Sequence, residues 1–212
     1  MNKLTASEIL DGLKSISEDY SLISIYWHIM IYLAIVLLLF AKWRPSNRMA
    51  AMFLSLPFIT VAVLAWESGN PFNGTLYSVL TFFCLLIGFR LSEERVQYSS
   101  IIYRIAGFLL LLFGLWYPHF IEPDNFIIYL YEAPSGLIPC PTLSVAIGMA
   151  LIYNGFNSNP MKIILICYGL FYGLFGLLKL GVYLDIVLLV GTIIFTIQSF
   201  MNRKPVLICE LF

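Results

Sequence analysis

Charged side chains are what this sequence has least of. They make up 11% of its 212 residues, whereas a soluble globular chain carries about 25%. Net charge is zero, so no basic surface indicates nucleic acid as a partner. The four cysteines (Cys84, Cys140, Cys167 and Cys209) lie far apart without CxxC spacing, which argues against a disulfide framework or structural zinc site. The first 20 residues contain no early apolar run, so no cleavable signal peptide is expected.

Apolar residues make up 60% of the chain and gather in long runs. A membrane-spanning helix needs roughly 20 apolar residues to cross about 30 Å of hydrocarbon. The runs therefore predict an all-α, polytopic membrane helical bundle of about seven transmembrane helices. The predicted helices cover residues 23–42, 49–66, 74–91, 101–117, 141–155, 161–179 and 182–201. The fifth is short and rich in small residues, so we expect it to lie inside the bundle.

Lysine and arginine in the loops predict the orientation, because cytoplasmic loops carry the excess of both. One side holds nine such residues and the other three. The nine are Lys42, Arg44, Arg48, Arg90, Arg95, Arg104, Lys162, Arg203 and Lys204, and the three are Lys3, Lys14 and Lys179. The N-terminus is therefore expected outside and the C-terminus in the cytoplasm, as a multi-pass protein of the bacterial plasma (inner) membrane.

The segments outside the spans divide the chain further. Residues 1–22 are predicted to form an external amphipathic helix, opened by a capping box from Thr5 to Glu8. This helix is either a membrane-surface anchor or a lid over an external mouth. The seven-span bundle occupies residues 23–201, and its longest loop, 118–140, is acidic, aromatic and external. Residues 202–212 form a cytoplasmic tail.

Pro139-Cys140-Pro141-Thr142 opens the fifth predicted helix. Pro141 suits the first turn of a helix, which places Cys140 at the N-cap, facing free backbone N–H groups. That setting favours the thiolate, the form that binds soft metals or attacks sulfur. We therefore expect Cys140 and Thr142 to be ligand-binding residues. The alternative is an ordinary helix start with Cys140 as a small buried side chain.

Lys179 and Asp185 lie at the external ends of the last two predicted helices, separated by a tight turn. Ionisable residues near spans are costly and are usually paired or functional. The two side chains are therefore expected either to form a structural ion pair or to handle a ligand.

His28 and His119 are also predicted to lie in the external half. Imidazoles bind metals or relay protons, and both histidines fit equally well beside an aromatic belt at the membrane interface. We count His119 among the candidate ligand-binding residues and place His28 with Cys140 as a candidate metal ligand. Most unusual polar residues thus face one side, which favours a site open to the outside.

The chain resembles an uncharacterised bacterial family of small seven-span membrane proteins. The shared features are Tyr117-Pro118, Pro139-Cys140-Pro141-Thr142, Gly181-Val182, Asp185 and the segment Asn70-Pro71-Phe72-Asn73. The chain departs from the usual pattern of that family at Leu143, Leu184 and Lys179. The resemblance implies the seven-span architecture and points to Cys140, but it implies no activity and no cofactor.

Three function classes follow. The first is binding or transport of a small solute, with Cys140 as ligand for a soft metal ion or a reduced sulfur species. The second is a membrane subunit or sensor that binds a partner protein, a second copy of the chain or an extracytoplasmic ligand. The third, a thiol oxidoreductase, needs a resolving cysteine near Cys140, and none is predicted at the external face, so an enzyme is the weakest of the three.

Overall fold

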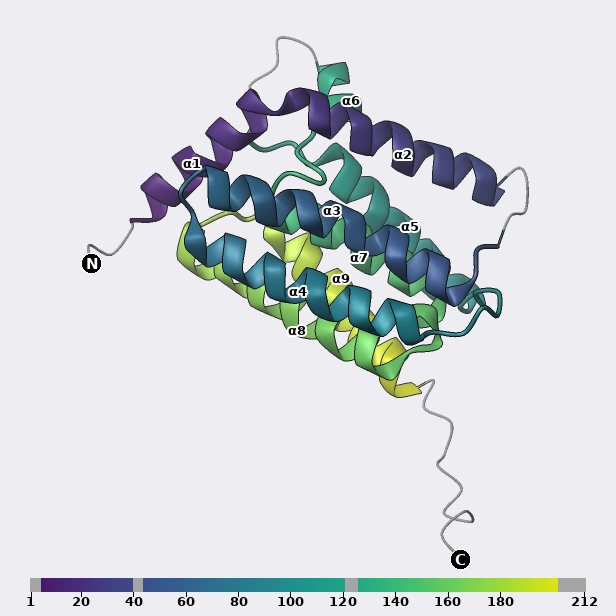
Figure 1. Ribbon diagram of the computed structural model, residues 1–212. Helices are drawn as coiled ribbons and strands as arrows, with labels where there is room; N and C mark the ends of the chain where they lie inside the picture. The colour runs from purple at the N-terminus through teal and green to yellow at the C-terminus, as the bar shows by residue number, and fades with distance from the viewer. Residues whose placement is uncertain (1–4, 40–43, 121–125, 202–212) are drawn as a thin grey trace, which may run out of the picture.

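The computed structural model describes residues 5–39, 44–120 and 126–201. Within these ranges every regular element is a helix, which confirms the all-α class. The helices are α1 (Ala6–Asp19), α2 (Ser21–Leu39), α3 (Asn47–Glu67), α4 (Pro71–Arg90), α5 (Ile101–Trp116), η1 (Phe126–Ile128), α6 (Tyr129–Glu132), α7 (Pro139–Ile152), η2 (Asn154–Asn157), α8 (Asn159–Phe175), η3 (Gly176–Leu180) and α9 (Asp185–Met201). The longer ones run side by side in Figure 1.

Helix length and composition support a membrane protein. Three helices are long and apolar enough to span a membrane: α3, α4, and α8 continued through η3. The pair α1 and α2, bent by 72°, adds a fourth if it is one span. Each of the seven predicted helical segments contains a helix, but α5, α7 and α9 are shorter than a usual span. Lys3, Lys42, Arg203, Lys204 and the predicted tail lie outside the described residues.

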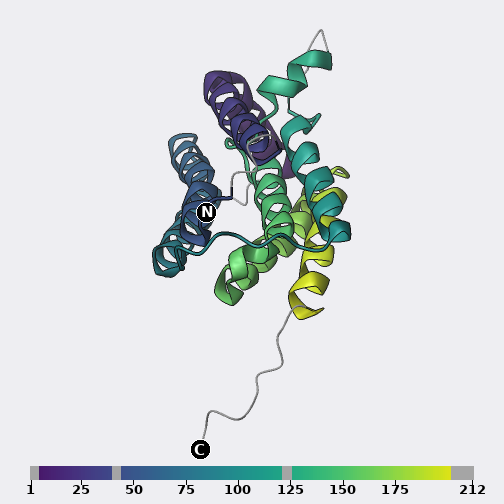
Figure 2. The ribbon, with the colours of Figure 1, turned by 90° about the vertical axis from the view of Figure 1, so that its right-hand side faces the viewer.

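Helix α7 lies in the middle of the bundle, as predicted for the short fifth segment (Figure 2). It packs against α5, α9 and α8, and nearly all of its side chains are buried. Its contact with α5 is close because two glycines of α5 face it: a Cβ at Gly107 would lie 2.6 Å from the carbonyl oxygen of Gly148. A Cβ at Gly114 would lie 2.7 Å from that of Pro141. Such small-residue contacts let membrane helices approach backbone to backbone.

Helix α1 crosses one end of the bundle (Figure 1). The predicted capping box is confirmed, since Thr5 and Glu8 exchange backbone and side-chain hydrogen bonds. Its apolar face buries Leu13 and Ile16 in a cluster with Leu64 of α3, Leu137 and Ile138. Part of the amphipathic face, at Leu13 and Ile16, thus packs on the rest of the protein.

The segment after α5 folds back over the same end. α6 packs on α2, and the Tyr32 hydroxyl donates to the carbonyl oxygen of Leu130 at 2.6 Å. The Ser24 hydroxyl donates to the carbonyl of Ala133, and the Ser135 hydroxyl donates to that of Gly114 at 2.5 Å. Residues 126–138 therefore form a fixed cover over the bundle end. The acidic Glu122 and Asp124 lie outside the described residues.

The opposite end is built differently. Residues 154–157, which join α7 to α8, all have φ between 52° and 60°, the left-handed region. A Cβ at Gly155 would overlap the aliphatic part of Lys162, so the buried lysine stem lies directly on this turn. We call this the Arg44 end, because Arg44 precedes α3 there, and the other the Asp185 end, because α9 begins there with Asp185.

Candidate functional site

Asp185 is a buried carboxylate at the first position of α9, with 1% of its surface exposed. The Tyr117 hydroxyl donates to Oδ1 at 2.6 Å. The Cys140 thiol donates to Oδ2 at 3.2 Å. Both carboxylate oxygens therefore accept a hydrogen bond from a side chain of another helix end, and we call these three residues the Asp185 cluster.

The fold brings the cluster together from three helix ends. Tyr117 is the C-cap residue of α5, Cys140 is the second residue of α7, and Asp185 is the first of α9. Gly176, where α8 passes into the π-helix η3, lies directly against the carboxylate, since a Cβ there would overlap Oδ2. The chain then reverses at Gly181, whose φ of 72° is left-handed. Glycine is the residue that adopts this conformation without steric cost.

The electrostatics of the cluster are unusual because no cation balances the carboxylate. No lysine, arginine or histidine forms an ion pair with Asp185 in the described part of the chain. A buried charge is costly unless it is hydrogen-bonded or paired. Here two neutral donors and the N-terminal end of the α9 dipole stabilise the negative charge. The cluster can therefore accept a cation without first breaking an ion pair.

Cys140 lies in a different setting from the one predicted. The N-cap of α7 is Ile138, so Pro139 and Pro141 both fall in the first turn, where backbone N–H groups have no partner within the helix. The two prolines are thus compatible with a regular helix start. The thiol donates a hydrogen bond to the carboxylate of Asp185. The predicted N-cap position of Cys140 is wrong, and the thiol faces a carboxylate where free backbone N–H groups were expected.

Lys179 does not join the cluster. It is exposed, lies at the end of η3, and forms no ion pair with Asp185. Lys179 lies in the wider turn of the π-helix, and the left-handed Gly181 follows it. This geometry turns the Lys179 side chain away from the start of α9. The predicted Lys179–Asp185 pair is therefore wrong.

His28 is buried between α2 and the end of α5. It is 1% exposed, and its two ring nitrogens lie 2.9 Å from the carbonyl oxygen of Ser24 and 2.8 Å from that of Leu115. His28 thus joins α2 to the end of α5, and the structure does not place it in the Asp185 cluster.

Two further predicted ligands lie beside the cluster without taking part in it. The Thr142 hydroxyl donates to the carbonyl oxygen of Ile138 at 2.6 Å and accepts from the backbone N–H of Gly136 at 2.8 Å, a structural role. The His119 ring lies edge to face with the ring of Tyr117, with centroids 6.3 Å apart. Burial lowers the pKa of His119 below its ordinary value, so the ring is neutral at neutral pH.

Neither of the other two cysteines in the described ranges forms a disulfide with Cys140. Cys84 is buried within α4 and Cys167 is exposed on α8, and both are free. Cys209 lies outside the described residues. Across the ranges that the structure describes, no group of three or more histidine, cysteine or acidic side chains converges on one point. Asp185 and Cys140 are thus a hydrogen-bonded pair with a phenol beside it.

Tyr117 and Gly176 are site residues that sequence reasoning did not select. In the sequence, Tyr117 stands out only within the Tyr117-Pro118 segment. Tyr77, fully buried on α4, holds the start of α7 in place. Its hydroxyl donates to the carbonyl oxygen of Pro139, the residue before Cys140, at 2.8 Å. Searching for phenols near the predicted Asp185 end would have suggested Tyr117.

No family model, curated protein or solved structure matches this chain.

Proposed function

We propose that this chain binds, and passes across the membrane, a small cationic solute at the Asp185 cluster, and that a soft divalent metal ion is the ligand it fits best. The observation that carries the proposal is the buried carboxylate of Asp185, hydrogen-bonded to a thiol and a phenol with no cationic partner. Intramembrane carboxylates of this kind mark ion pathways.

Charge matching favours a divalent ion. When a metal replaces the thiol proton, the S–H bond breaks, a sulfur–metal bond forms, and one proton leaves for solvent. Asp185 and Cys140 then carry two negative charges, which a divalent ion neutralises. Neutrality matters because uncompensated charge is costly at low dielectric. Thiolate and carboxylate together suit a soft or borderline ion such as Cd²⁺ or Zn²⁺.

The distances allow such an ion after a small opening of the pair. A tetrahedral zinc ion holds a thiolate sulfur and a carboxylate oxygen about 3.6 Å apart, against 3.2 Å between Sγ and Oδ2. Both groups sit at helix starts, where a slight outward movement of α9 from α7 widens the gap. The remaining coordination positions would be filled by water or by the Tyr117 oxygen.

Access is proposed from the extracytoplasmic side. We infer seven spans, an external N-terminus and a cytoplasmic C-terminus in a bacterial plasma membrane, with α2, α3, α4, α5, α7, α8 and α9 as the spans. The loop charges support this orientation, because Arg44, Arg48, Arg90 and Arg104 all belong to the end opposite Asp185. In this arrangement α1 and residues 126–138 form the cover through which a solute enters.

The experiment that tests this is modification of Cys140 by a membrane-impermeant maleimide in intact cells, with Cys84, Cys167 and Cys209 replaced by serine. We expect slow labelling of the protonated thiol, further slowed by Cd²⁺. The matched control is Asp185→Asn, in which Cd²⁺ no longer protects. Labelling only after the membrane is permeabilised would place Cys140 on the other side, and protection that persists in Asp185→Asn would remove the carboxylate from the site.

A second candidate function is a subunit that binds another membrane protein or a second copy of the chain. Helix α2 favours it, because α2 packs mainly on α6 and α1 and exposes Leu22 (80%), Ile29 (60%) and Leu33 (51%). Purification as a stoichiometric complex, with loss of the partner when Ile29 is changed to serine, would support this function. A monomer with intact Cd²⁺ binding would exclude it.

A further inference from the structure

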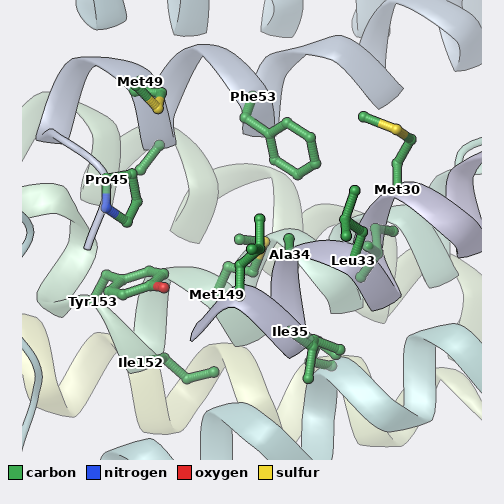
Figure 3. A pocket seen from close by; sticks show the side chains of 14 residues that line it. Met30, Leu33, Ala34, Ile35, Pro45, Met49, Phe53, Met149, Ile152 and Tyr153 are labelled. Carbon is green, nitrogen blue, oxygen red and sulfur yellow. The ribbon is translucent and has the colours of Figure 1, made fainter. Parts of the chain in front are cut away.

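An apolar groove runs between α2 and the rest of the bundle, and no residue of the Asp185 cluster lines it (Figure 3). Its volume is about 170 Å³, and an apolar cavity of about 150 Å³ already accommodates a benzene molecule. Side chains from α2, α3, α5 and α7 line it, among them Met30, Ala34, Met49, Phe53, Met149 and Tyr153. Methionine side chains adapt to irregular apolar shapes, so this lining suits a flexible hydrocarbon chain.

Two guanidinium groups, those of Arg44 and Arg104, lie at one end of this groove. Tyr153, which lines the groove, stacks on Tyr98 with ring centroids 5.8 Å apart. The Arg44 guanidinium lies 4.7 Å from the centroid of the Tyr98 ring, and that of Arg104 lies 5.7 Å from it. The groove, the two tyrosines and the two arginines thus form one continuous surface, which we call the Arg44 groove.

Arg44 and Arg104 differ from Arg48, which has an acidic partner. Arg48 pairs with Glu93 at 2.6 Å, whereas neither Arg44 nor Arg104 forms an ion pair in the described part of the chain. Nε of Arg104 is buried without a hydrogen-bond partner. Two like charges on one ring repel each other, and an anion between them would remove the repulsion and satisfy that buried donor.

We propose that the Arg44 groove binds one anionic phospholipid, with an acyl chain along α2 and the headgroup phosphate between Arg44 and Arg104. Its components fit a lipid better than a soluble anion, because the apolar part of the site adjoins the cationic part and faces the membrane interior. In the proposed orientation this end is cytoplasmic, where the membrane surface is negative. The lipid site is separate from the Asp185 cluster, and neither depends on the other.

The test is native mass spectrometry of the detergent-purified full chain, exposed to equal amounts of phosphatidylglycerol and phosphatidylcholine. We expect one retained phosphatidylglycerol per chain. Since each basic side chain near a lipid surface contributes about 1 kcal/mol, loss of both in Arg44→Gln with Arg104→Gln is expected to lower phosphatidylglycerol retention by about thirtyfold. Arg90→Gln, an exposed arginine at the same end outside the groove, is the charge control and should change nothing.

The acyl-chain contact is tested by filling the groove. Ala34→Phe places a ring inside it and should lower retention of both lipids, whereas Val36→Phe, on the same helix but outside the lining, should not. Equal retention of the two lipids, or a preference that survives loss of both arginines, would overturn the proposal. Complete displacement of the lipid by excess inorganic phosphate would overturn the groove assignment, since the acyl chain would then contribute nothing.

Discussion

The two ends of this bundle handle ionisable groups in opposite ways. At the Asp185 end one carboxylate is buried and held by neutral donors from α5 and α7. At the Arg44 end, the guanidinium groups of Arg44 and Arg104 lie on the ring of Tyr98. Arg48, at the same end, pairs with the exposed Glu93. Because Asp185 is buried, the stability of its cluster depends on every atom around it. The charges at the Arg44 end can be compensated by solvent and lipid headgroups, so substitutions there should affect stability less.

The two ends should therefore respond differently to substitution. A buried charge raises the cost of leaving any partner unsatisfied, and an exposed charge contributes little to stability. Substitutions at the Asp185 end should therefore change both stability and ligand binding. Substitutions at the Arg44 end should change ligand binding alone.

Asp185→Ala should have the largest effect. It leaves the Tyr117 hydroxyl and the Cys140 thiol without an acceptor and opens a small cavity, so we expect about 3 kcal/mol less free energy of unfolding. Chemical denaturation in detergent measures this. A variant as stable as the parent would show that the cluster does not form.

Gly176→Ala should have the next largest effect. We expect its free energy of unfolding to fall by about 2 kcal/mol, because the added Cβ would overlap the Asp185 carboxylate. Gly12→Ala is the matched control. No atom lies within 4 Å of a Cβ at Gly12, and replacing a helical glycine there should stabilise α1 by about 0.5 kcal/mol. Equal effects in the two variants would contradict the close contact between η3 and α9.

Tyr117→Phe removes one donor and keeps the ring. We expect a loss of about 1.5 kcal/mol in the free energy of unfolding, since the bond is made to a charged acceptor. Cys140→Ser keeps a donor at the same place and should be nearly neutral to stability while abolishing soft-metal binding. If Cys140→Ser destabilises more than Tyr117→Phe, the hydrogen-bond assignment is incorrect.

The double variant Arg44→Gln, Arg104→Gln should leave the free energy of unfolding within about 0.5 kcal/mol of the parent in lipid-free detergent. Both side chains stack on the Tyr98 ring without an ion pair. Chemical denaturation of the parent and the variant side by side measures this. A loss as large as that of Asp185→Ala would remove the contrast between the two ends.

Glu8, an exposed carboxylate on α1, should show the smallest effect, as a pH dependence. Hydrogen bonds from the Thr5 backbone N–H and hydroxyl lower its pKa from the ordinary value of 4.5. A depressed pKa adds stability above 4.5, and that stability is lost as the pH falls through the lowered value. The protection factors of amides in the first turn of α1, which correct exchange for its intrinsic pH dependence, should therefore fall in acid. Glu8→Gln should have the low protection factors at every pH.

The sequence predicts the helices well and the site only in part. Apolar runs predict the seven segments, and the capping box predicts the start of α1, because these signals are local. Asp185 and Cys140 could be selected as unusual residues, but their contact depends on how α7 and α9 are offset. The short sequence distance between Lys179 and Asp185 predicts an ion pair that the structure lacks. The π-helix before Gly181 turns the lysine outward, and no clear sequence signal predicts that helix.

The central claim is that Asp185 and Cys140 together hold one soft divalent ion. The direct test is titration of the purified chain with Cd²⁺, with Cys84, Cys167 and Cys209 replaced by serine, while bound metal and released protons are counted. The account predicts one ion and one proton per chain, and no binding after Cys140→Ser or Asp185→Asn. Binding that persists at full affinity in Asp185→Asn, or no binding by the parent, would contradict it.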